Sequence, residues 1–129
     1  MTITITPALH DALKTCSDIE REIIALGRRA DPARKLDLVQ CRRRFAENIG
    51  TLAQLIDAEH ELKKSPDKLQ EMGRLFSSFR YAIGQHQASW PAVRIDEDLI
   101  AYSASAHATY AKSGLFWHWC TQNLGFNRT

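Results

Sequence analysis

Cysteine, glycine and proline are all scarce in this chain of 129 residues, which has three, six and four of them. The cysteines, Cys16, Cys41 and Cys120, are far apart in the sequence and form no CxxC pair. An odd and scattered set argues against a disulfide framework and against a zinc knuckle, so we expect reduced core thiols in a cytoplasmic protein. The small number of glycines and prolines leaves room for long helices joined by few turns.

Long apolar runs and catalytic motifs are absent as well. The sequence has no stretch of roughly 18 apolar residues that could cross a membrane. Residues 1–7 have neither the basic part nor the apolar part of a signal peptide. We also find no phosphate-binding loop, no dinucleotide-binding glycine motif and no nucleophile elbow. The sequence therefore indicates no reaction, and we expect no cofactor.

Four stretches instead carry apolar residues at steps of three and four, which is the spacing of one face of an α-helix. We expect helices over about residues 7–29, 32–64, 67–88 and 96–123. Three of them follow typical starts, in which a capping residue precedes a proline: Thr6-Pro7, Asp31-Pro32 and Ser65-Pro66. The predicted core stripes are Leu9, Leu13, Cys16, Ile19 or Glu20, Ile23 and Leu26 in the first helix, Leu38, Cys41, Phe45, Ile49, Leu52 and Ile56 in the second, and Leu69, Met72, Phe76, Phe79 and Ile83 in the third.

Short connections make neighbouring helices antiparallel. The predicted fold class is therefore all-α, an up-down-up-down four-helix bundle in which residues 1–129 form a single domain. Residues 1–6, where Ile3 and Ile5 alternate with threonines, form a short extended arm in this interpretation. The turn between the first two helices should share one end of the bundle with the start of the fourth helix.

The densest apolar block is residues 115–120, LFWHWC, in the last predicted helix. Because successive helical residues are about 100° apart, six apolar residues in a row surround the helix axis. Three neighbouring helices would not cover such a segment, so we expect a second subunit, a ligand or the N-terminal arm to lie against it. The predicted partner or ligand contacts are Phe116, Trp117, His118 and Trp119.

Large aromatic side chains of this kind commonly anchor interfaces between proteins. The first functional hypothesis is therefore a small regulatory or adaptor module that acts through protein–protein association. We expect it to form a homo-oligomer with this block at the contact.

Histidines provide a second hypothesis, from a different functional class. His10, His60 and His118 should lie at the end of the bundle that the first helix starts from. Bundles bind metals through Glu-x-x-His pairs on facing helices, and Asp57-x-x-His60 is the only similar pair here. We therefore predict no metal site. The second hypothesis is that the bundle binds a metal or small ligand, as a sensor or small enzyme, and in that case these three histidines are the candidate ligands.

Basic residues are concentrated around the turn between the first two helices. The patch consists of Arg28, Arg29, Arg34, Arg42 and Arg43. It could bind a phosphate or an acidic partner, although the acids of residues 96–98 should lie at the same end and neutralise part of it. The formal net charge is only +2, and no aromatic residues alternate with the arginines as they do in single-strand nucleic-acid sites. Nucleic acid binding is thus the third hypothesis.

Overall fold

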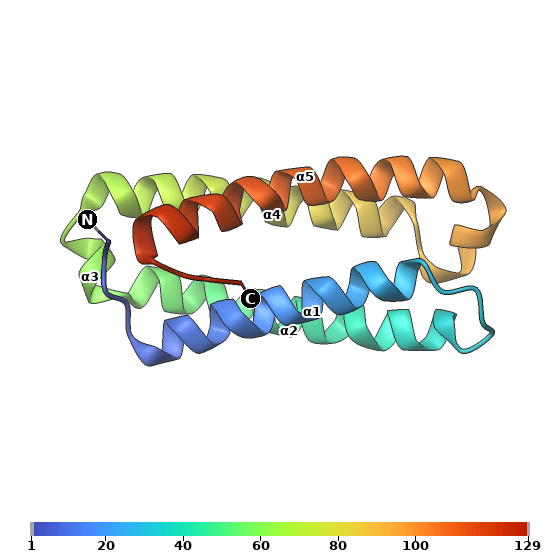
Figure 1. The fold of residues 1–129 in the computed structure, drawn as a ribbon, viewed down its shortest axis with the longest axis horizontal. Helices are drawn as coiled ribbons and strands as arrows, with labels where there is room; N and C mark the ends of the chain where they lie inside the picture. Colours follow the sequence, from blue (N-terminus) through green and yellow to red (C-terminus); the bar gives the residue numbers. More distant parts are fainter. Residues whose placement is uncertain (1, 129) are drawn as a thin grey trace.

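The computed structural model describes residues 2–128, which contain six helical elements and no strand (Figure 1). The elements are α1 (Pro7–Gly27), α2 (Arg34–Ala58), α3 (His60–Lys63), α4 (Pro66–Ser89), the 3-10 helix η1 (Ala92–Glu97) and α5 (Leu99–Leu124). Met1 and Thr129, which the predicted arm and the predicted domain include, lie outside the described residues.

The long helices pair as two antiparallel hairpins, α1 with α2 and α4 with α5. Figure 1 shows the two hairpins lying along each other, so that the chain runs up, down, up and down. α2 also packs against α4 and η1, whereas α1 and α5 face each other across a seam with few direct backbone contacts. The predicted four-helix bundle is therefore confirmed.

The core follows the predicted apolar stripes. All six stripe residues of α2, from Leu38 to Ile56, are buried, and both Ile19 and Glu20 of α1 are buried. In the middle of the bundle the rings of Phe76 and Phe79 each lie 5.5 Å from the ring of Phe116, measured between centroids. Within residues 2–128, no helix combines the length and the apolarity needed to span a membrane.

α2 begins at Arg34, two residues after the predicted start. Asp31, the expected capping residue, has its carboxylate bound by Arg29, with Nε to Oδ2 at 2.7 Å and Nη2 to Oδ1 at 2.6 Å. Ala33 occupies the capping position and has no side-chain acceptor. An ion pair across the turn therefore replaces the expected side-chain cap.

The predicted second helix is interrupted at Glu59. This residue has extended backbone angles, φ −71° and ψ 112°. Its Oε1 accepts hydrogen bonds from the backbone N–H of Thr6 at 2.7 Å and from the Thr6 hydroxyl at 3.0 Å. Local propensity favours a continuous helix here, because alanine, glutamate and lysine are strong helix formers. The contact with the N-terminal arm outweighs that preference.

The last helix starts at Leu99, not at the predicted residue 96. Its cap is Asp98, whose Oδ1 accepts from the backbone N–H of Ala101 at 3.0 Å. The residues predicted as its start form the end of η1 instead, where Asp96 pairs with Arg34. At the other end, Gly125 has φ 64° and closes the helix in the left-handed conformation that glycine adopts without strain.

Candidate functional site

The aromatic block of α5 is largely buried within one copy of the chain. Phe116, Trp117 and Trp119 are 0%, 2% and 5% exposed. Leu115 and His118 point outward, one helical turn apart. The three buried rings are therefore not available as the partner contacts that the sequence predicted, and only His118 of that set lies at the surface.

The two ends of the chain help to cover this block. The ring of Phe126 stacks on Trp117 with centroids 5.7 Å apart, and the guanidinium of Arg128 lies 4.9 Å from the centre of the same indole. In the arm, the backbone N–H of Ile3 donates to the carbonyl of Asn123 at 2.7 Å. The sequence predicted the arm as one of three possible covers, but it gave no indication of the C-terminal residues.

A buried carboxylate holds the C-terminal residues in place. Glu20 of α1 is 2% exposed. Its Oε1 accepts from Arg128 Nη2 at 2.7 Å, and its Oε2 accepts from the indole N–H of Trp117 at 3.3 Å. Arg128 Nε also donates to the hydroxyl of Ser17 at 3.0 Å. Both carboxylate oxygens thus have partners within the chain, so this network is part of the fold and offers nothing to a ligand.

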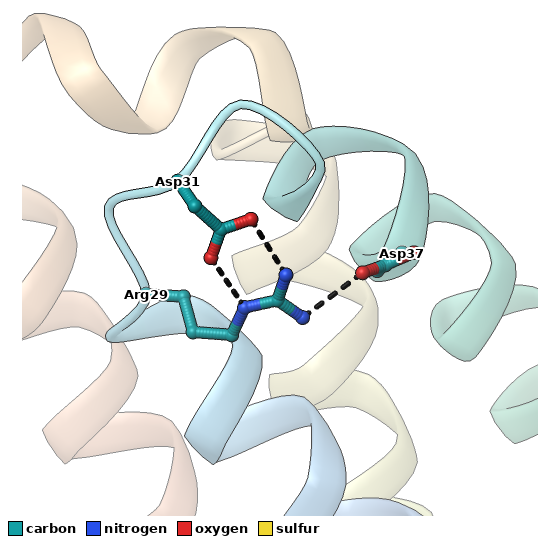
Figure 2. Close-up of polar contacts among 3 residues, drawn as sticks. All are labelled: Arg29, Asp31 and Asp37. Carbon is teal, nitrogen blue, oxygen red and sulfur yellow. Dashed lines mark hydrogen bonds and ion pairs between the residues drawn. The ribbon is translucent and has the colours of Figure 1, made fainter.

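The predicted basic patch is divided by the structure. Figure 2 shows Arg29 between two carboxylates, with Asp31 on one side and Asp37 at 2.9 Å on the other. The hydrogen bonds that Arg29 donates to Asp31 and Asp37 raise the pKa of Arg29, and the bonds donated to Asp31 lower the pKa of Asp31. Arg28 and Arg43 are exposed. The patch therefore has less free charge for nucleic acid than the sequence suggested.

Arg34 and Arg42 point into the bundle instead of outward. Arg34 is 2% exposed, and its Nη2 pairs with Asp96 Oδ1 at 2.5 Å, which confirms the expected partial neutralisation. Arg42 Nη1 donates to the carbonyl of Trp90 at 2.7 Å, and burial lowers the pKa of Arg42. The other two nitrogens of each guanidinium have no hydrogen-bond partner among residues 2–128. Buried polar groups rarely lack partners, so this cluster requires an explanation.

Three aromatic side chains, His86, Tyr102 and Tyr110, form a cluster that feels the charge of Arg42. His86 Nδ1 lies 2.7 Å from the Ser105 hydroxyl, and its ring is 5.4 Å from that of Tyr102 and 6.2 Å from that of Tyr110. Burial, with a smaller contribution from the charge of Arg42, lowers the pKa of His86 to about 4. Its Nε2 also lacks a partner within the described chain. His86 is thus neutral near pH 7 and adds a third buried group with unused hydrogen-bonding capacity.

A groove of about 570 Å³ opens between α1 and α5 beside this cluster. Its lining includes Arg28 from the end of α1, and Tyr102, His107 and Tyr110 from α5; Arg28 is the only residue with a permanent charge in it. A methyl group on Gly27 would overlap the hydroxyl of Tyr102, so glycine permits this side chain to approach α1. The groove has the size of a small-molecule pocket.

Tyr102 connects the groove with the buried arginines. Burial raises the pKa of the Tyr102 hydroxyl, and the charges of Arg42 and Arg34 oppose that rise, so both guanidiniums lie near this lining residue. Arg34 and Arg42 lie four residues before and four residues after Leu38. That spacing places both on the core stripe of α2, and it was the available signal that they face inward.

Exposed apolar side chains are concentrated at the same end of the bundle. Seven large apolar side chains are exposed in the described chain. Five of them lie at the start of α2, on η1 or at the start of α5, and the other two are Tyr81 and Leu115. We refer to these five as the η1-end surface: Leu36, Val39, Val93, Leu99 and Ile100. No local pattern in the sequence indicates this surface, because it depends on which helix ends meet.

The candidate metal ligands gain no support from the structure. His10, His60 and His118 are all exposed, and residues 2–128 contain no group of three or more histidine, cysteine or acidic side chains that could hold a metal ion. The three cysteines are free and buried, and burial raises the pKa of each thiol. They are core residues, as predicted.

Comparison with protein-family models, with curated proteins and with solved structures gave no match for this chain.

Proposed function

We propose that this protein is an association module, whose activity is to bind a second copy of itself through the η1-end surface. The observation that carries the proposal is the concentration of exposed apolar side chains at one end of the bundle. Exposed apolar residues beside charged ones mark interaction sites in many proteins. The proposal keeps the association predicted from the sequence and moves the contact from the aromatic block to the opposite end of α5.

The charges beside the η1-end surface favour a second copy as the partner. Lys35 and Arg43 are exposed on α2, and Glu97, which lies 3.6 Å from Arg94 of the same helix, is exposed on η1. In a two-fold dimer the η1-end surfaces of the two chains contact each other. The basic residues of each chain then face the acidic residue of the other, so this charge contact occurs twice. An apolar centre with a charged rim is the usual anatomy of such interfaces.

Ile100→Glu tests the proposal, because Ile100 is 85% exposed in a single chain and should be buried in the dimer. Sedimentation velocity over a dilution series should show a wild-type dimer, with its dissociation constant raised at least about tenfold by the substitution, since burying one isoleucine contributes about 1.5–3 kcal/mol. An acid in the first turn of α5 suits the helix dipole, so the fold should be retained.

Leu115→Glu is the matched control, because Leu115 is 60% exposed on the same helix but far from the η1 end. It should leave the dissociation constant unchanged. A wild-type protein that stays monomeric at every concentration would contradict the proposal, and so would a control that dissociates as much as Ile100→Glu.

A further inference from the structure

We infer that the groove between α1 and α5 binds a small organic anion, in which a carboxylate or phosphate group is joined to an aromatic or apolar body. The inference does not depend on self-association, because none of the residues of the η1-end surface lines the groove. It rests on the charge behind the groove, on the chemistry of its lining and on its volume.

Two guanidiniums lie in the interior of the bundle. Arg34 and Arg42 carry two positive charges into the interior, whereas Asp96 is the one carboxylate that pairs with either of them in residues 2–128. A buried charge without a full set of partners is costly, and apolar residues of similar volume would pack this end of the bundle at no such cost. The groove lies beside this positive charge, because Tyr102 lines the groove and is close enough to both guanidiniums to feel their charges. Arg28 at the edge adds a third charge.

The lining indicates what is attached to the anionic group. Tyr102 and Tyr110 present aromatic rings with hydroxyls, whereas Ala106 and Ala111 leave room beside them. His107 is the remaining titratable residue of the lining, and no carboxylate lines the groove. A volume of about 570 Å³ exceeds what a bare inorganic ion fills and lies within the range of small-molecule sites. The favoured ligand therefore carries a ring or short apolar body that packs between the tyrosines.

Three probes test this inference: phenyl phosphate, benzoate and inorganic phosphate, each titrated into the full chain and followed by nuclear magnetic resonance and by calorimetry. Saturable binding of phenyl phosphate or benzoate is expected, with shifts centred on Tyr102, His107 and Tyr110. The stronger of these two probes identifies the anionic group, and inorganic phosphate should bind more weakly than either. The absence of saturable binding by both organic anions would overturn the inference, as would equal affinity for inorganic phosphate.

Arg28→Gln and Arg74→Gln distinguish binding in the groove from general attraction to surface charge. Both arginines are exposed, so each variant should fold, and each removes one positive charge. Of the two, Arg28 lines the groove and Arg74, on α4, does not. Arg28→Gln should weaken binding by about tenfold, the size expected for one charge-assisted hydrogen bond, whereas Arg74→Gln should change it by less than about twofold. Equal losses in the two variants would assign the binding to surface charge and overturn the inference.

Discussion

Arg128→Ala should destabilise the whole bundle, although Arg128 lies next to the last residue of the sequence. The guanidinium is 2.7 Å from a carboxylate oxygen of Glu20, which is 2% exposed. Truncation leaves that carboxylate with one indole N–H from Trp117 as its hydrogen-bond donor. Removing one partner of a fully buried pair costs about 3–5 kcal/mol. The Arg128 side chain is 28% exposed, so solvent screens part of the interaction, and we expect a loss of about 2–3 kcal/mol.

Urea unfolding measures this loss directly. The transition should be followed by circular dichroism and by tryptophan fluorescence, to which Trp117 of the same network contributes. Linear extrapolation gives the free energy of unfolding, and an unchanged slope shows that the same surface is exposed in both proteins. A difference of less than about 0.5 kcal/mol, the usual effect of a surface substitution, would refute the assignment of Arg128 to the core network.

A double-mutant cycle with Glu20→Gln identifies the cause. The neutral amide removes the buried charge, so Arg128→Ala should cost less than about 1 kcal/mol in that background. If Arg128→Ala costs as much with glutamine at position 20 as with glutamate, its effect comes from lost packing on Trp117 and the charge argument is wrong.

Two further predictions concern buried aromatic residues. Trp119→Ala should lower the free energy of unfolding by about 3–5 kcal/mol without changing the sedimentation mass, because the ring is buried within one chain; a change in mass with little loss of stability would contradict this. The folded-state pKa of His86, about 4, lies below its ordinary value of 6.5, so the unfolded chain binds the proton more tightly. The contribution of neutral His86 to the free energy of unfolding should therefore be fully present above about pH 6.5 and should fall as the pH drops towards 4. The total loss should be about 3 kcal/mol, because each unit of pKa difference corresponds to about 1.36 kcal/mol. Urea midpoints of wild type and His86→Gln over this range measure it, and parallel curves would show that His86 does not contribute.

The helices and their buried faces could be predicted from the sequence because both depend on local spacing. The stripe of α2 shows this, since every residue predicted from its steps of three and four is buried. The helix ends were less predictable. The Glu59 side chain binds Thr6, 53 positions away in the sequence, and a pattern of neighbouring residues gives no indication of such a partner. The Asp31 side chain binds Arg29, two positions before it, instead of capping α2, and the rule for helix starts does not include that competition.

The candidate sites could be predicted only in part, for the same reason. The patch around the first turn was found, but its division into paired, exposed and buried arginines depends on Asp37 and Asp96, which meet Arg29 and Arg34 only in the folded chain. The burial of Trp117 depends on Phe126 and on Glu20, far away in sequence. The groove depends on how the two hairpins lie against each other, so no local pattern indicates it.

The pairing of the helices into two hairpins also sets an order of assembly. Contacts within a hairpin join segments separated by one short turn, whereas the bonds from Trp117 and Arg128 to Glu20 join residues 97 and 108 positions apart. Short loops close at a lower entropic cost, so each hairpin should form before the two meet. The bonds to Glu20 then form last. Contacts that form after the folding barrier slow unfolding while leaving the folding rate nearly unchanged, so loss of the bonds to Glu20 should shorten the lifetime of the native state more than it slows folding.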